Sequence, residues 1–340
     1  MAGLRATLEL CRFDPQTDRE ARWELVEVTL PEGSTVLEAL MHVQEHIDGS
    51  LAFRRSCRHG ICGSCGMRIN GCARLACNTQ LTAAVEQARR MAAVRRLAGR
   101  GAPASADVAP APVRVEPLGN MPVIKDLICD MSAFWAKLHA VRPWLQSLQE
   151  APDPDRERLM TQDDWTTLAE GVLCLECGCC SSDCCSLEAD EEFAGPAALV
   201  KAYRYACDTR DDQTHRRLSD LSAEHGLWGC TRCSFCTERC PKHLRVRDLI
   251  VRLGQLAWAE GLRADPGAER CGEVMASVRD TGRAHEFRLP PRMEDIVKTP
   301  ARVSSAARAL SGGEAGGDDP VPVERLEELR AILNAAEERE

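Results

Sequence analysis

Twelve of the nineteen cysteines in this 340-residue chain fall into three tight groups, and their spacing constrains the fold more than any other feature. Thiols at such short intervals are typical of metal ligation. Disulfides in a small secreted domain are the other common reason for a high cysteine content, but this chain is long and we expect no export signal at its start. The sequence therefore predicts a protein that folds around several metal centres.

The first group, "SCRHGICGSCGMRINGCARLAC", has the spacing C-x4-C-x2-C, and another cysteine follows after eleven residues. This is the spacing with which plant-type ferredoxins bind a 2Fe–2S cluster. The glycines of the loop let its backbone wrap closely and aim N–H groups at the sulfurs. Cys72 is an alternative fourth ligand, and a zinc site is the alternative to iron. The predicted 2Fe–2S ligands are Cys57, Cys62, Cys65 and Cys77.

The second and third groups, "CLECGCCSSDCC" and "CTRCSFCTERCP", share the spacing C-x2-C-x2-C-x3-C. Two such runs are the bacterial two-cluster pattern, in which the fourth cysteine of each run binds the other cluster. A double zinc site is the alternative. The expected 4Fe–4S ligands of one cluster are Cys174, Cys177, Cys180 and Cys240. The expected ligands of the third cluster are Cys184, Cys230, Cys233 and Cys236.

Seven cysteines remain outside these sets. Free cysteine is commonly a small interior hydrophobe, so we expect these residues to be buried and not to bind metal. Two of them, Cys179 and Cys185, stand directly beside predicted ligands. The seven are Cys11, Cys72, Cys129, Cys179, Cys185, Cys207 and Cys271.

The N-terminal part of the chain has the pattern of a small β domain. Residues 5–33 predict two strands, and residues 35–47 predict a helix with one apolar side. Residues 82–100 predict a basic helix that Thr82 could cap, and "VRVEPL" predicts a last strand. Two strands, a helix and a cysteine-rich loop are the order of a β-grasp ferredoxin. We expect that domain over residues 1–118, with the basic helix and a linker inserted at about 82–112.

The remainder of the chain is predicted to be helical. Residues 119–263, from "PVIKDLICDMSAFWAKL" onward, have a helical pattern broken only by the two later cysteine groups, which predicts an all-α two-cluster domain. Residues 264–340 form an extension, in which 301–320 predict a flexible tether. The fold class is therefore α+β, a β-grasp 2Fe–2S domain followed by an all-α bacterial-type two-cluster ferredoxin domain. The last helix should carry on one face Leu326, Leu329, Ile332 and Leu333.

Charge and hydropathy exclude two classes of function. The chain has 43 Lys and Arg against 52 Asp and Glu, a formal net charge of −9, which argues against nucleic acid as a partner. No stretch approaches the 18 apolar residues that a membrane-spanning helix requires. We therefore expect a cytosolic protein.

Beyond the cysteines, "MPVIKDLICDMSAFWAKLHAVRPWL" and "GPAALVKAYRYACDTRDD" contain no expected ligand and still match a known family. Over about residues 5–260 the chain closely resembles the iron–sulfur subunit of succinate dehydrogenases and fumarate reductases. The resemblance implies an FAD-containing flavoprotein partner, membrane anchor subunits and a quinone. It also implies one-electron relay through three clusters, peripheral attachment to the membrane, and no catalytic residue of this chain's own.

The sequence departs from the usual family pattern around the third cluster. Cys233 replaces a non-ligand residue, which predicts a 4Fe–4S cluster in place of the common 3Fe–4S cluster, as in a minority branch of the family. The family proline and tryptophan that follow the position of Cys184 are missing, and Thr231 replaces a histidine. These changes keep open an alternative, the iron–sulfur subunit of a thiol- or heterodisulfide-linked fumarate reductase. A redox-inactive zinc scaffold is the remaining alternative.

Overall fold

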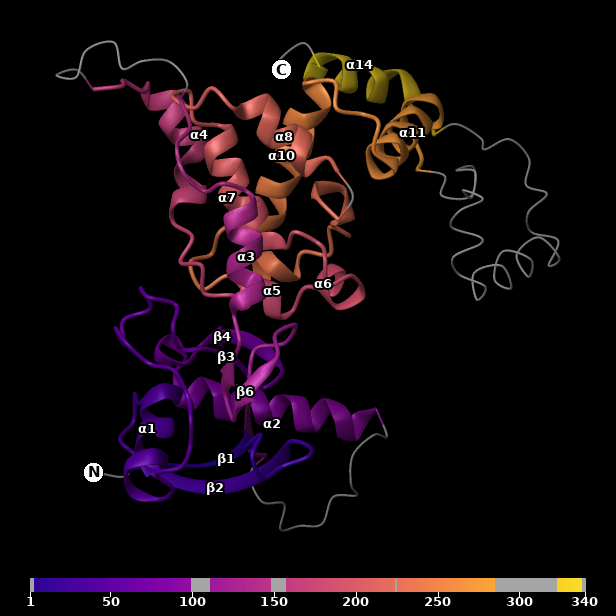
Figure 1. The fold of residues 1–340 in the computed structure, drawn as a ribbon. Coiled ribbons are helices and arrows are strands. Elements are labelled where there is room, and N and C mark those ends of the chain that lie inside the picture. Colours follow the sequence, from indigo (N-terminus) through magenta and orange to yellow (C-terminus); the bar gives the residue numbers. More distant parts are fainter. Residues whose placement is uncertain (1–2, 99–110, 148–156, 224, 285–322, 338–340) are drawn as a thin grey trace. The chain divides into compact units, whose positions relative to one another are not determined.

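The computed structural model describes residues 3–98, 111–147, 157–223, 225–284 and 323–337 (Figure 1). It divides into two compact units, Met1–Gly261 and Leu262–Glu340. Among the described helices, none is long and apolar enough to cross a bilayer.

A five-stranded mixed sheet forms the N-terminal part of the first unit. Its strands lie in the order β2-β1-β5-β3-β4, with β1 and β5 parallel and the other neighbours antiparallel. Ala6, Leu8 and Leu10 alternate along β1 and are buried, as expected for a strand with one face on a core. The strands are β1 (Leu4–Arg12), β2 (Arg22–Leu30), β3 (Gly66–Ile69), β4 (Cys72–Leu75) and β5 (Val113–Glu116).

Helix α1 (Val36–His46) covers this sheet with a buried apolar face. It begins with a capping box: Glu38 N donates to Thr35 Oγ1 at 3.2 Å, and Thr35 N donates to Glu38 Oε2 at 2.7 Å. The basic helix α2 (Leu81–Leu97) follows the short 3-10 turn η1 (Ala76–Asn78). The prediction that Thr82 caps α2 was wrong, because the helix begins one residue earlier, where Leu81 N donates to the carbonyl oxygen of Ser34.

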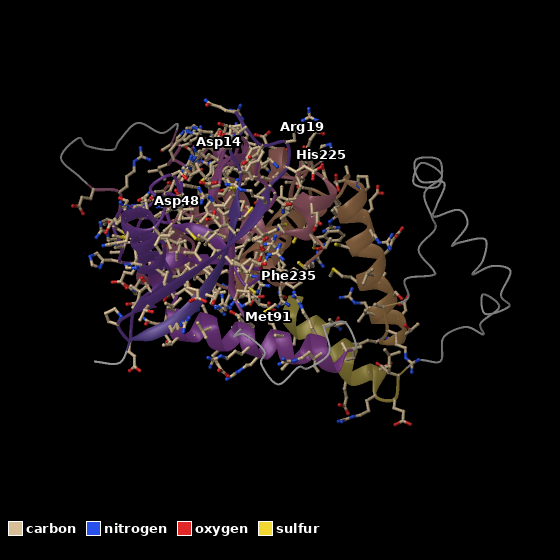
Figure 2. All side chains as sticks on the ribbon, turned by 90° about the horizontal axis from the view of Figure 1, so that it is seen from below. Asp14, Arg19, Asp48, Met91, His225 and Phe235 are labelled. Carbon is tan, nitrogen blue, oxygen red and sulfur yellow. The ribbon has the colours of Figure 1, made fainter. Side chains whose placement is uncertain are left out.

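The segment that joins the sheet to the helices begins as a hairpin. The prediction that helical structure begins at residue 122 was therefore wrong over residues 123–129, and the first helix begins at Ser132. Strands β6 (Val123–Lys125) and β7 (Ile128–Cys129) turn at Asp126, which has a φ of 45°. Its buried carboxylate accepts hydrogen bonds from Arg12 Nε (3.1 Å), Phe13 N (2.9 Å) and Ala52 N (2.8 Å). The same guanidinium also pairs with Asp48, which is labelled in Figure 2. These tertiary contacts override the local helical pattern.

Helix α7 lies at the centre of the helical part and packs against α10, α4, α8, α3 and α5. Its buried face includes Leu199, Val200 and Tyr203, and the Tyr203 hydroxyl donates to the carbonyl oxygen of Thr167 at 3.0 Å. The longer helices here are α3 (Ser132–Ala140), α4 (Gln162–Val172), α7 (Pro196–Ala206), α8 (Thr214–Leu221) and α10 (Val246–Ala259). The short elements are α5 (Cys179–Ser182), α6 (Cys185–Ala189), η2 (Leu227–Gly229) and α9 (Phe235–Glu238).

The second unit contains α11 (Pro266–Thr281) and the terminal helix α14 (Leu326–Glu337), which pack on each other. Of the four apolar residues predicted to share one face of α14, three are half-buried, whereas Ile332 is 66% exposed. The predicted tether over 301–320 lies outside the described residues.

Candidate iron–sulfur centres

The loop between α1 and β3 brings the first cysteine group together through backbone hydrogen bonds to sulfur. Cys57 Sγ accepts from the N–H groups of His59 (3.4 Å) and Cys62 (3.3 Å). Gly60 N donates to Cys77 Sγ at 3.3 Å, and Gly60 has a φ of 68°, which favours glycine. Backbone N–H groups that point at sulfur in this way suit a cluster held by thiolates.

Two further contacts define this group. Cys77 N donates to Cys65 Sγ at 3.5 Å, and burial raises the pKa of Cys65 to about 12. A hydrogen bond from Ser64 lowers the pKa of Cys62 to about 6. Cys72 instead pairs with Ile69 in the β3–β4 hairpin, and among the described contacts none joins its sulfur to the other four.

The second and third groups line two separate cavities, and each cavity takes three cysteines from one run and one from the other. This is the arrangement that the crossed two-cluster pattern predicts. The second cavity, named after the second cysteine group, is lined by Cys174, Cys177, Cys180 and Cys240. The third cavity, named after the third group, is lined by Cys184, Cys230, Cys233 and Cys236.

The two runs share one backbone conformation. Glu176 and Gly178, on either side of Cys177, have φ values of 54° and 78°. The equivalent residues of the other run, Arg232 and Ser234, have φ values of 58° and 72°. Left-handed conformations are unusual for residues other than glycine. Their recurrence at matched positions indicates that the two loops are shaped for the same kind of binding site.

The helical turns that follow these loops also match. Ser182 N donates to the Gly178 carbonyl oxygen at 2.9 Å in α5, and Glu238 N donates to the Ser234 carbonyl oxygen at 3.2 Å in α9. Cys233 therefore stands at the backbone position that Cys177 occupies in the other run.

The thiols of both cavities suit a cationic metal centre. Burial raises the pKa of Cys180 well above its usual value, and the neighbouring thiols raise it further. Burial and the neighbouring thiols likewise raise the pKa of Cys236 to about 12. Such thiols become thiolates when a bound metal compensates their charge. Soft thiolate sets of four fit iron–sulfur clusters, and the donor set alone also fits zinc.

The 2Fe–2S loop touches the second cysteine group directly. A Cβ added to Gly63 would lie 2.7 Å from Cys177 Cβ, and one added to Gly66 would lie 3.0 Å from the Cys177 carbonyl oxygen. Only glycine permits this approach of the two segments.

A lysine that the sequence analysis did not predict lies beside the second cavity. Lys201 lies on α7, is 13% exposed at its side chain, and pairs with Glu176 Oε1 at 2.8 Å. Its Nζ also lies 3.5 Å from the carbonyl oxygen of Cys174. Because Lys201 is 17 or more residues from either cysteine run, spacing alone could not have found it.

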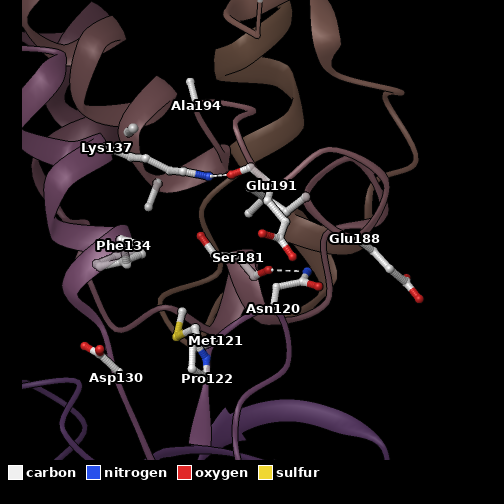
Figure 3. A pocket seen from close by; sticks show the side chains of 14 residues that line it. Asn120, Met121, Pro122, Asp130, Phe134, Lys137, Ser181, Glu188, Glu191 and Ala194 are labelled. Atoms are coloured by element: carbon white, nitrogen blue, oxygen red, sulfur yellow. Dashed lines mark hydrogen bonds between the residues drawn. The ribbon is translucent and has the colours of Figure 1, made fainter.

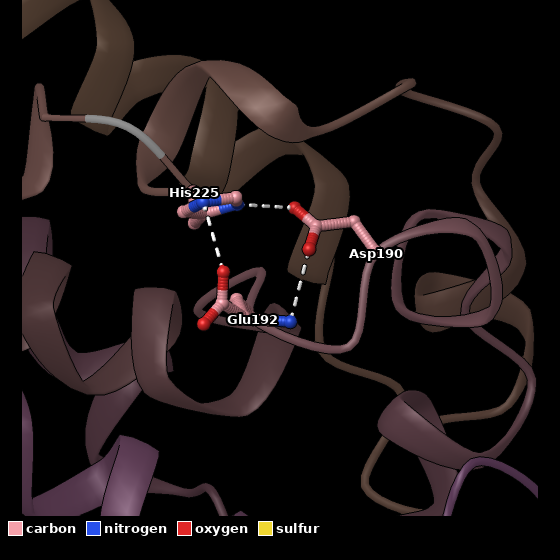
Figure 4. A group of neighbouring side chains, drawn as sticks. All are labelled: Asp190, Glu192 and His225. Atoms are coloured by element: carbon pink, nitrogen blue, oxygen red, sulfur yellow. Dashed lines mark hydrogen bonds and ion pairs between the residues drawn. The ribbon is translucent and has the colours of Figure 1, made fainter.

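A histidine between two carboxylates joins the segments that flank the third cavity (Figure 4). His225 Nδ1 lies 2.7 Å from Asp190 Oδ2, and Nε2 lies 3.1 Å from Glu192 Oε2. Each ring nitrogen faces a carboxylate, which is the geometry of an ion-paired imidazolium. This hydrogen bond to His225 lowers the pKa of Asp190.

A pocket of about 450 Å³ lies between α3 and the segment after α6 (Figure 3). Met121, Phe134 and Leu187 supply apolar lining, and Lys137 Nζ donates to the main-chain carbonyl oxygens of Glu191 and Phe193. Burial lowers the pKa of Lys137. None of the twelve predicted ligand cysteines is among its described lining residues.

Comparisons with known proteins agree with this architecture. A family described as "2Fe-2S iron-sulfur cluster binding domain" matches residues 7–136, and one described as "4Fe-4S dicluster domain" matches residues 172–244. The fumarate reductase iron-sulfur subunit of Mycobacterium tuberculosis (strain CDC 1551 / Oshkosh) is 38% identical over 259 residues, 76% of this chain and 95% of that protein. The subunit of the same name from Haemophilus influenzae (strain ATCC 51907 / DSM 11121 / KW20 / Rd) is 32% identical over 253 residues, 72% of this chain and 89% of that protein.

A solved structure shares the fold. A chain of the Mycobacterium smegmatis Sdh1 complex in the apo form superimposes with a TM-score of 0.58 at 26% identity and covers 78% of this chain and 99% of that chain. Together these matches confirm the predicted fold class, a 2Fe–2S ferredoxin-like domain followed by a helical 4Fe–4S dicluster domain. The chain belongs to the family of iron–sulfur subunits of fumarate reductase and succinate dehydrogenase complexes.

Proposed function

We propose that this chain relays electrons between an FAD-containing subunit and a quinone site of a membrane anchor, at the cytoplasmic side of the membrane. The proposed ligands are the twelve cysteines in three sets of four given above, with Cys233 as the fourth ligand of the third centre. When bound, such clusters carry single electrons, whereas flavin chemistry yields two electrons together. The residues of this chain hold, orient and shield the centres.

One observation carries this proposal: the three cysteine sets are contiguous. The Gly63 loop of the first set touches Cys177 of the second. The second and third cavities are each completed by a cysteine from the opposite run. Three adjoining sets of thiols make a path through the first unit, whereas separate structural metal sites have no need to adjoin.

A four-iron third centre is supported by the matched backbones of the two runs. Glu176 and Arg232 share a left-handed conformation, as do Gly178 and Ser234. Cys233 therefore has the same backbone surroundings as Cys177, which is a proposed ligand of a four-iron cluster. A three-iron centre would leave a thiol lining the cavity without a role.

Iron and acid-labile sulfide analysis of the anaerobically purified complex tests the proposal. Three clusters of the proposed types require about ten irons and about ten sulfides per chain. EPR of the oxidised and reduced complex should show no oxidised three-iron signal. Zinc in place of iron, or a colourless protein, would overturn the electron-transfer function, and a three-iron signal would overturn only the role of Cys233.

The acceptor is tested separately. We expect membranes that contain the complex to couple succinate and a quinone. The alternative, a thiol-linked fumarate reductase, is favoured by Thr231 and by the missing tryptophan after Cys184, because both positions depart from the usual quinone-site residues of the family. It predicts fumarate reduction driven by dithiols and no turnover with quinones, so assaying both donors with one preparation decides between them.

A further inference from the structure

A non-ligand thiol lies against the third cavity. Cys185 follows directly after Cys184 and begins α6, and its Sγ lies 3.4 Å from Cys233 Sγ. The same sulfur lies 3.1 Å from Thr231 Oγ1. Both distances are hydrogen-bond distances for sulfur and oxygen, so Cys185 contacts a proposed ligand and a hydroxyl at once.

A second hydroxyl continues this contact. Ser186 Oγ donates to Thr231 Oγ1 at 3.5 Å, and it accepts the N–H of Thr231 at 3.2 Å. Thr231 follows directly after Cys230, so the backbone bond fixes the hydroxyl between the two cysteine runs. The contacts therefore run from Ser186 through Thr231 and Cys185 to the sulfur of Cys233.

The direction of these hydrogen bonds follows from the chemistry of the groups. A thiolate that binds iron has no proton, so Cys233 can only accept, and Cys185 S–H must donate to it. With the Cys185 proton committed, its sulfur accepts from the Thr231 hydroxyl, which in turn accepts from Ser186. Each group donates one proton along the chain, and bonds aligned in this way polarise one another.

Cys185 acts beside the cavity and not inside it. In the described part of the chain, the cavity is lined by Ser186, Thr231 and the four proposed ligands of the third centre, but Cys185 is not among the lining residues. Its thiol therefore contacts the Cys233 sulfur without being one of the described residues that line the cavity.

We propose that Cys185 is a positioning residue that sets the reduction potential of the third centre. Its thiol, supported by Thr231 and Ser186, donates a hydrogen bond to the Cys233 sulfur. Hydrogen bonds to ligand sulfurs stabilise the reduced, more negative form of a cluster and raise its potential. This inference rests on the proposed function, since it requires Cys233 to hold a redox-active cluster.

Redox titration of the intact complex, monitored by EPR of the third centre, tests the inference. Loss of one hydrogen bond to a charged sulfur is expected to lower the equilibrium constant for reduction about tenfold in Cys185→Ala, or about 59 mV for one electron. Cys185→Ser keeps a donor and should stay near the unsubstituted protein. Thr231→Val removes the support and should shift the potential in the same direction by less. Cys11→Ala, in β1, is the matched control for loss of a non-ligand cysteine.

Several outcomes would overturn the inference. An unchanged potential in Cys185→Ala would remove the tuning role, and equal shifts in Cys185→Ala and Cys185→Ser would assign the effect to packing. Loss of one iron from Cys185→Ala, with a three-iron signal, would make Cys185 a ligand. If Cys185→Ala does not assemble, the potential of Thr231→Val decides the question. An unchanged potential in Thr231→Val would then overturn the proposed hydrogen-bond chain. Failure of the proposed function is distinguishable, because the unsubstituted complex would then lack the third four-iron signal.

Discussion

Asp183 and Arg239 form an ion pair of 2.7 Å between Oδ2 and Nε, and each residue stands directly before the last cysteine of its run. Their side chains are 8% and 19% exposed. The same Asp183 oxygen accepts the N–H of Ala73 in β4 at 3.1 Å. One carboxylate therefore ties the two cysteine runs to each other and to the ferredoxin sheet.

Asp183→Asn should destabilise the protein by about 3 kcal/mol, because it leaves the largely buried Arg239 guanidinium with only the exposed Glu238 as its counter-charge. We expect faster release of iron from the second and third centres to a chelator, followed by visible absorbance. Glu238→Gln is the control, since Glu238 also pairs with Arg239 but is 57% exposed. Equal release rates for Asp183→Asn and the control would contradict the structural role of the pair.

Gly63→Ala should disturb the first and second centres together. The added methyl would lie 2.7 Å from Cys177 Cβ, and φ at this residue is +73°, which costs about 1–2 kcal/mol for alanine. We expect lower iron content and altered EPR signals of both centres. Gly71→Ala is the control, because it has a φ of +75° and no atom within 4 Å. If Gly71→Ala lowers the iron content and alters the EPR signals to the same extent, the cause is backbone strain and not the contact with Cys177.

Cys233→Ala should convert the third centre to a three-iron cluster and leave the other two unchanged. The remaining cavity thiols, Cys184, Cys230 and Cys236, suffice for three irons. The expected result is an oxidised three-iron EPR signal and loss of about one iron per chain.

Cys72→Ala should leave the 2Fe–2S signal intact, because Cys72 lies in the β3–β4 hairpin. Loss of that EPR signal would show that Cys72 is a cluster ligand.

Asp208→Asn should lower the free energy of unfolding by about 2 kcal/mol. Burial alone would raise the pKa of Asp208, but hydrogen bonds from Arg210 and Arg204 outweigh it and hold the pKa at about 2. This lies below the unfolded value of about 3.9, so the contribution is fully present above that value and is lost only as the pH falls through 2.

Thermal unfolding followed by circular dichroism checks this prediction at two pH values. The deficit of Asp208→Asn should be the same at pH 6 and pH 8, because both lie above both pKa values. The exposed Asp163→Asn is the control and should change stability little. A deficit that differs between the two pH values would assign the effect to another titrating group.

The cysteine spacings were readable within each run because each interval is a local property of one loop, and the fourth cysteine from the opposite run followed from the two-cluster pattern. The alternation of β1 and the apolar side of α1 were likewise readable, since each is a periodic pattern that faces one core. The same reading failed at Asp126, whose neighbours have a helical pattern but whose carboxylate is held by Arg12, Phe13 and Ala52. Contacts over about a hundred residues leave no periodic signal.

Other features of the site could not be predicted, because they also depend on contacts between distant parts of the chain. Cys185 and Thr231 each stood beside a predicted ligand, but only the fold places their side chains 3.1 Å apart. The left-handed conformation of Ser234 could not be predicted from the residue itself, because serine rarely adopts it; the glycine at the matched position in the other run was the one available signal. Asp183 and Arg239 precede corresponding cysteines, which in retrospect was a usable signal.

The matched loops around Cys177 and Cys233 separate the shape of a centre from its nuclearity. The turn at residues 232–234 has the main-chain geometry of the other run, and in the proposed function one side chain within it, Cys233, decides between three and four irons. Under that proposal, a single codon change at this position shifts the driving force of the last transfer step in a descendant protein without rebuilding its scaffold.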